Sequence, residues 1–193
     1  MILESIEASE LAIPFKGAFK HAAAERHATQ SLWVRARAAS GETGFGEGCP
    51  REYVTAESLG TSLSFVDRHR AEWLAEIRDL EALRSWVEIH EALIDTHPAA
   101  WTAVELALLD VLGRRQNFSV ESLLGVPELA GRFQYTAVLG DGSTAQFAAQ
   151  LERFLLAGFC TFKIKLSADR RENEAKIRVL VASGLGGDAV RAD

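Results

Sequence analysis

The order of hydrophobic patterns from residue 133 onward constrains the fold of this chain more than any other feature. Short apolar runs alternate there with helical periods, which predicts strands over residues 134–139, 160–166 and 189–193 and helices over residues 144–157 and 169–183. Strands that alternate with helices imply right-handed crossovers and a parallel sheet. Functional groups in such sheets gather at the C-terminal ends of the strands, so a candidate site is expected at that edge.

The middle strand of this region carries two lysines at alternate positions, Lys163 and Lys165. Phe162, Ile164 and Leu166 point to the opposite face, because successive side chains of a strand alternate between faces. Parallel strands are covered on both faces, so two ammonium groups on one face indicate either a catalytic role or an anionic ligand. A solvated edge strand is the alternative, which this pattern alone leaves open.

The first part of the chain predicts a small antiparallel sheet followed by helices. Strands are expected over residues 2–13, 32–38 and 45–49, and helices over residues 56–68, 71–94 (continuous or broken) and 99–115. The last helix is apolar nearly all round, which places it in the interior. Gly44, Gly46 and Gly48 permit tight bends, but no helix N-terminus follows them, so a phosphate-binding loop is disfavoured.

Composition and charge exclude several classes of function. The chain has 193 residues, 48% hydrophobic content and a formal net charge of -6, which is typical of a globular protein of one or two domains and argues against nucleic-acid binding. The acidic start and the lack of a long apolar run argue against a signal peptide and a membrane span, so the cytoplasm is the expected location. Cys49 and Cys160 fit no metal-binding spacing and are expected to be buried free thiols.

Several segments, taken together, resemble the enolase superfamily, and within it the muconate-lactonizing subgroup of the mandelate racemase/muconate lactonizing enzyme family. In chain order they are the hairpin at residues 44–48, the helix Glu105-x-Ala107-Leu108-x-Asp110-x-x-Gly113, the sequence Leu-Leu-Gly at residues 123–125, Lys163-x-Lys165 and Arg191-x-Asp193. The resemblance covers essentially the whole chain. It implies an α+β capping domain over residues 1–125, with an antiparallel sheet plus helices, and the first part of a (β/α) TIM-type barrel over residues 126–193.

The resemblance also implies a proton-transfer reaction. Enzymes of this superfamily remove a proton next to a substrate carboxylate with a Lys or His base, and Mg²⁺ stabilises the resulting enediolate. Lys165 matches the acid/base, and Lys163 matches the neighbouring positive charge that steadies the developing anion. Asp193 matches the first of three carboxylate ligands of Mg²⁺. Members of the subgroup share these groups but act as cycloisomerases, epimerases or o-succinylbenzoate synthases, so the reaction and the substrate stay open.

Contacts with a small carboxylate substrate are expected from two loops of the capping domain, residues 14–21 and residues 49–53, which close over the barrel mouth in the family that the chain resembles. The candidates are Phe15, Phe19, Arg51 and Tyr53. Ordinary loop packing is an equal explanation for the aromatic residues, and a solvated charge is slightly favoured for Arg51.

The resemblance further implies that the chain is the N-terminal part of an enzyme. About three strands cannot close a barrel that needs eight, and the other metal carboxylates and the second catalytic lysine would come from later strands. The chain alone is therefore expected to be inactive and not to hold Mg²⁺. Its exposed sheet edge favours self-association, so a homo-oligomer is expected. The alternative is a non-catalytic truncated remnant or an oligomerising module of the same fold.

Overall fold

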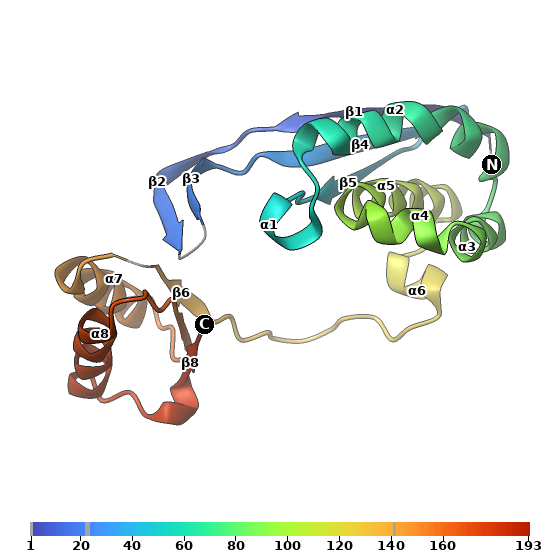
Figure 1. Ribbon diagram of the computed structural model, residues 1–193. Helices are drawn as coiled ribbons and strands as arrows, with labels where there is room; N and C mark the ends of the chain where they lie inside the picture. The colour runs from blue at the N-terminus through green and yellow to red at the C-terminus, as the bar shows by residue number, and fades with distance from the viewer. Residues whose placement is uncertain (1, 22–23, 141) are drawn as a thin grey trace. The chain divides into compact units, whose positions relative to one another are not determined.

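The computed structural model describes residues 2–21, 24–140 and 142–193, and the side chains at these positions except those of residues 17–25. The chain divides into two compact units (Figure 1). The first comprises Met1–Ile13 and Thr29–Ala130, and the second comprises Pro14–Ala28 and Gly131–Asp193. Within the described ranges, no helix combines the length and the apolar character that a membrane span requires.

The first unit is built on an antiparallel sheet with the strand order β1-β4-β5. Its strands are β1 (Leu3–Leu11), β4 (Ser31–Ala38) and β5 (Thr43–Gly48). Leu32, Val34 and Ala36 of β4 are fully buried on one face, whereas Arg35 and Arg37 on the other face are exposed. This alternation confirms the predicted half-buried strand.

The predicted helical interval over residues 71–94 is broken in the structure. The helices of the first unit are α1 (Glu52–Thr55), α2 (Leu59–Glu76), α3 (Leu80–Ile89), α4 (Glu91–Thr96), α5 (Pro98–Gln116) and α6 (Val120–Leu124). The break falls where Asp79 caps α3, because its carboxylate accepts a hydrogen bond of 2.9 Å from the backbone N–H of Ala82.

Helix α5 is central, as predicted, and it lies in main-chain contact with β5. Ala99, Ala103 and Ala107 of the helix face the glycines of the strand. A Cβ atom on Gly46 would lie 2.0 Å from the carbonyl oxygen of Ala103, and one on Gly48 would lie 2.0 Å from that of Ala99. The prediction that these glycines serve tight bends is therefore wrong, because they lie within the strand and permit the close approach of α5.

Glu57 is a buried carboxylate that caps the N-terminus of α5. Its side chain accepts hydrogen bonds from the backbone N–H groups of Ala99 (2.8 Å) and Ala100 (2.9 Å), and the residue is 2% exposed. His97, the N-cap residue, offers no side-chain acceptor to the helix. Glu57 thus satisfies donors that the first turn leaves free, and its negative charge is favourable at the positive end of the helix dipole.

Replacing Glu57 by glutamine is expected to lower the free energy of unfolding of the first unit by about 2 kcal/mol, because an amide offers one oxygen to two buried donors and carries no charge. Urea denaturation followed by tryptophan fluorescence measures this loss. Glu52→Gln, an exposed acid in the first turn of α1, is the matched control, with an expected change within about 0.5 kcal/mol. Equal losses in the two variants would contradict the capping role.

The second unit contains the predicted parallel sheet, with the order β6-β7-β8. Its elements are the antiparallel pair β2 (Pro14–His21) and β3 (Ala24–Ala28), then β6 (Ala137–Leu139), α7 (Thr144–Leu156), β7 (Phe162–Ile164), α8 (Arg170–Ala182), a short 3-10 helix (Gly187–Ala189) and β8 (Val190–Ala192). Figure 1 shows α7 and α8 side by side next to this sheet. The alternation of strands and helices predicted from the sequence is confirmed.

The apolar row of β7 faces the helices of the second unit. Phe162 and Ile164 are buried in one cluster with Phe147 and Leu151 of α7 and Leu180 of α8. Because neighbouring residues of a strand point to opposite faces, the lysines that alternate with them lie on the other side of the sheet. This is the arrangement that the sequence pattern predicted for the two faces.

Cys49 and Cys160 are free thiols, but both are exposed, so the prediction that they are buried is wrong. Cys49 follows β5 directly and continues the exposed row of Phe45 and Glu47, since alternate residues of a strand share a face. Cys160 lies between α7 and β7, where its sulfur accepts a hydrogen bond from the side-chain amide of Gln134 (2.8 Å).

Candidate functional site

The candidate site lies where β7 and β8 end. Lys163 pairs with Arg191 in the parallel register of the two strands, and Asp193 follows β8 directly. The backbone N–H of Asp193 donates to the carbonyl of Ile164 (3.0 Å), and the N–H of Leu166 donates to the carbonyl of Asp193 (2.9 Å). Main-chain hydrogen bonds thus hold Asp193 beside the strand that carries the two lysines.

The side chains of Lys163, Lys165 and Asp193 converge on one point. Lys163 Nζ lies 2.8 Å from Asp193 Oδ2, and Lys165 Nζ donates a hydrogen bond to the same oxygen. The side chain of Lys165 is 24% exposed, compared with 39% for Lys163 and 41% for Asp193, so Lys165 is the most shielded of the three. We call these three residues the lysine cluster.

Electrostatics within the lysine cluster favour an ionised carboxylate. The hydrogen bonds from Lys163 and then Lys165 lower the pKa of Asp193 from 3.8 to about 2. Asp193 therefore carries a full negative charge at neutral pH, held between two amino groups. An arrangement of this kind can hold an anion beside an amine that is placed to move a proton.

The titration of Asp193 gives a direct check on this geometry. The pKa of the Asp193 carboxyl is depressed in the folded chain. The attraction to the lysines is therefore complete above about pH 3.8 and is lost as the pH falls through about 2. Carbon-detected NMR of the Asp193 side chain is expected to give a midpoint near 2, and Lys163→Met should move that midpoint upward. A midpoint at the ordinary aspartate value in the unmodified chain would contradict the contact.

The described residues do not by themselves form a Mg²⁺ site. Across residues 2–21, 24–140 and 142–193, no three His, Cys, Asp or Glu side chains gather as metal ligands. Mg²⁺ prefers six oxygen ligands in octahedral geometry, whereas the lysine cluster offers one carboxylate whose Oδ2 already binds two amino groups. At most one ligand for such an ion comes from this cluster.

The predicted substrate-contact residues are spread over both units. Phe15 on β2 belongs to the second unit and is 38% exposed, and the side chain of Phe19 lies outside the described residues. Tyr53 on α1 belongs to the first unit and is 50% exposed. Both of these aromatic side chains are exposed, and their role as substrate contacts stays a prediction.

Arg51 makes hydrogen bonds that the sequence did not reveal. Its guanidinium donates to the carbonyl oxygens of Gln30 (3.1 Å), Pro50 (2.5 Å) and Thr29 (2.9 Å). Gln30 has a φ of 49°, in the left-handed region that non-glycine residues rarely adopt. Arg51 thus ties the segment that follows β3 to the end of β5. Backbone acceptors leave no trace in a sequence, so no pattern could have predicted this role.

The two ends of the segment Pro14–Ala28, which separates the two parts of the first unit in the sequence, are also joined through Thr29. Its hydroxyl donates to the carbonyl of Leu11 (2.5 Å) and accepts from the N–H of Ile13 (3.0 Å), and its own N–H donates to the carbonyl of Ile13 (3.0 Å). Together with the bonds of Arg51, these contacts fix both ends of the segment that carries β2 and β3.

Comparison with known proteins gives consistent similarities. The family described as "Mandelate racemase / muconate lactonizing enzyme, N-terminal domain" matches residues 6–125. The L-Lys-D/L-Arg epimerase of Methylococcus capsulatus is 31% identical over 170 residues, which cover 84% of this chain and 45% of that enzyme. The chain thus spans about half the length of the curated relatives it matches.

Solved structures show the same fold. The substrate-liganded L-Ala-D/L-Glu epimerase of Bacillus subtilis superimposes with a TM-score of 0.86 at 25% identity, covering 100% of this chain and 53% of that one. The dipeptide epimerase of Methylococcus capsulatus, complexed with Mg and the dipeptide L-Arg-D-Lys, gives a TM-score of 0.80 at 24% identity, covering 100% of this chain and 54% of that one.

Proposed function

Because the chain belongs to the mandelate racemase/muconate lactonizing enzyme family of the enolase superfamily, we propose that it is the N-terminal part of an epimerase. The reaction is removal and return of a proton at the carbon next to a carboxylate. In this proposal residues 1–125 form the capping domain and residues 126–193 form the first strands and helices of the barrel. The observation that carries the proposal is the convergence of Lys163, Lys165 and Asp193.

Lys165 is the proposed acid/base. As a neutral amine it accepts the α-proton of the substrate and becomes an ammonium group, while the electron pair of the C–H bond moves into the substrate carboxylate to form an enediolate. Its lower exposure within the lysine cluster supports this role, because a shielded amine is protected from exchange with water. Return of a proton to the opposite face, by a group outside these residues, would invert the carbon.

Lys163 is the proposed electrostatic partner. Its amino group lies at the same carboxylate oxygen as that of Lys165, so it contributes positive charge where the substrate becomes more negative. Asp193 is the proposed first ligand of Mg²⁺ in a complete enzyme, where the ion would stabilise charge on the substrate carboxylate. The remaining oxygen ligands would have to come from outside the 193 residues.

The proposed substrates are dipeptides or N-acylated amino acids. Curated relatives include L-Lys-D/L-Arg and L-Ala-D/L-Glu epimerases and an N-succinyl-L-Arg/Lys racemase, each named for inversion at an amino-acid centre. Phe15, Phe19 and Tyr53 are proposed substrate contacts. For Arg51, the hydrogen bonds to three carbonyls support a positioning role, and direct contact with the substrate stays a prediction.

Deuterium exchange tests the proposal. A complete polypeptide that contains this chain is incubated in D₂O with Mg²⁺ and a panel of dipeptides and N-succinyl amino acids, and proton NMR follows loss of the substrate α-hydrogen. Exchange is expected for at least one member of the panel, and residues 1–193 alone are expected to give none. Failure of the complete polypeptide to exchange any member would overturn the proposed reaction.

A further inference from the structure

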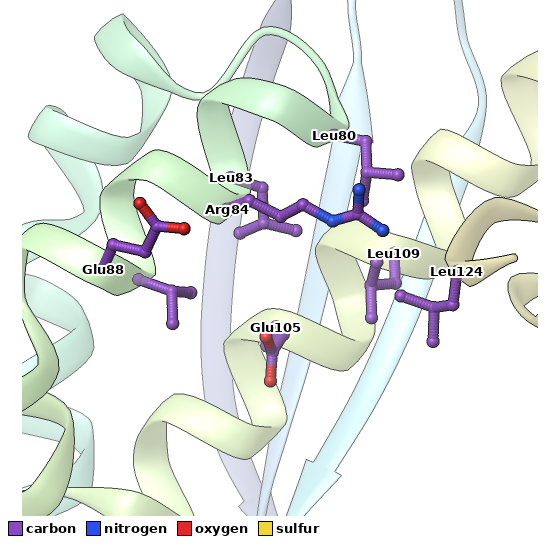
Figure 2. Close-up of a pocket in the computed structure, with 8 residues that line it drawn as sticks. Leu80, Leu83, Arg84, Glu88, Glu105, Leu109 and Leu124 are labelled. Atoms are coloured by element: carbon purple, nitrogen blue, oxygen red, sulfur yellow. The ribbon is translucent and has the colours of Figure 1, made fainter.

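The first unit contains a pocket, separate from the lysine cluster, that has the properties of a ligand site. A pocket of about 190 Å³ lies between α3, α5 and α6 (Figure 2). Its apolar wall consists of Leu80, Leu83, Val87, Leu109 and Leu124. An engineered apolar cavity of about 150 Å³ binds benzene, so this pocket has room for a compact apolar group of that size.

The pocket also contains a carboxylate with which none of the described residues pairs. Glu105 on α5 is half-buried, and burial raises the pKa of its carboxyl. Among the residues that the structure describes, none makes an ion pair or a hydrogen bond with the Glu105 side chain. A carboxylate that is partly shielded from water and has no such partner is less well solvated than an exposed one, so a cation placed beside it would gain a charge-assisted hydrogen bond.

The other two charged residues of the pocket do not pair with Glu105. Arg84 and Glu88 both come from α3 and are exposed. Figure 2 shows the guanidinium of Arg84 extending across the pocket towards Leu109 and Leu124, away from Glu105. The side of Glu105 that faces the pocket is therefore open to a positive group from a ligand.

We propose that this pocket binds a small organic cation with a compact apolar body. The ammonium or amidinium group of the ligand donates hydrogen bonds to the carboxylate of Glu105, and the apolar body lies among the five aliphatic side chains of the wall. Charge complementarity selects a cation over a neutral molecule of the same shape, and apolar burial selects it over a simple inorganic ion. The site does not use the lysine cluster or depend on the proposed reaction.

Methyl NMR on the 193-residue chain tests the proposal. The probe is benzylamine, which is a cation at neutral pH, and the control is benzyl alcohol, an uncharged molecule of similar shape. Benzylamine is expected to shift the methyl signals of Leu83 and Leu109 in a saturable way, and benzyl alcohol should bind roughly ten- to a hundredfold more weakly. Glu105→Gln should remove this preference, because the amide keeps the shape and loses the charge. Glu88→Gln, on the exposed rim, is the matched control and should keep it.

Several results would overturn the proposal. They are equal affinities of the two ligands for the unmodified chain, unchanged benzylamine binding in Glu105→Gln, and the absence of any saturable shift. A preference for benzoate would also overturn it, since that result would make Arg84 the recognition group. Thermal unfolding of each variant shows whether the fold is kept, and benzyl alcohol binding to Glu105→Gln reports whether the pocket retains its shape.

Discussion

Replacing Gly46 by alanine is expected to lower the free energy of unfolding of the first unit by at least about 3 kcal/mol. The added Cβ would lie 2.0 Å from the carbonyl oxygen of Ala103 and 2.8 Å from the backbone nitrogen of Ala107. Both atoms belong to the main chain of α5, so no side-chain rotation can relieve the overlap. The strand and the helix have to separate, which exposes apolar surface at the centre of the core.

Urea denaturation followed by tryptophan fluorescence measures this effect, because all four tryptophans of the chain lie in the first unit. Gly60→Ala is the matched control. Gly60 is in the first turn of α2, where the nearest atom to an added Cβ is Ser58 Oγ at 3.8 Å, so alanine there is expected to raise the stability by up to about 1 kcal/mol. A Gly46→Ala chain as stable as the unmodified one would refute main-chain contact between β5 and α5.

The second large effect is expected at Lys165 in the deuterium-exchange assay. Lys165→Arg keeps the positive charge but removes the base, since a guanidinium does not give up its proton under these conditions. General acid–base catalysis contributes roughly 10²- to 10⁴-fold, so the exchange rate should fall by at least about 10²-fold. A base on one face of the substrate reaches the α-hydrogen of one epimer, so exchange should be lost for that epimer, and interconversion of the two epimers should stop.

Lys163→Arg is the matched control for this experiment. The same substitution at Lys163 keeps the charge that this residue is proposed to supply, so exchange of both epimers should continue at a reduced rate. Retention of exchange for both epimers in Lys165→Arg would remove Lys165 as the base. Loss of exchange in both variants alike would contradict the separate roles of base and electrostatic partner that are proposed for the two lysines.

Much of the fold could be predicted because it depends on periodicity. The parallel sheet of the second unit follows from the alternation of strand and helix periods, and the position of Asp193 beside Lys163 and Lys165 follows from the rule that parallel strands end at one edge. The central place of α5 follows from its apolar character on all sides. In each case the signal lies in residue types that are close together in the chain.

The rest could not be predicted because it depends on main-chain atoms far away in the sequence. Glu57 accepts from N–H groups 42 and 43 residues away, and Arg51 donates to carbonyls 21 and 22 residues away. Every residue except proline carries the same backbone groups, so these partners have no signature in the sequence. Gly46 gave a partial signal, a glycine within a strand, but the helix that requires it lies elsewhere in the chain.

The bonds of Arg51 have a consequence for which side chains near the ends of the segment Pro14–Ala28 matter for its attachment. Carbonyl oxygens are present at every position, so the three hydrogen bonds of Arg51 do not themselves depend on the side chains at Gln30 and Pro50. Among the residues that the structure describes, the side chains of Arg51 and Thr29 therefore make the hydrogen bonds that hold the two ends of the segment Pro14–Ala28, and substitutions at these two positions are expected to loosen it.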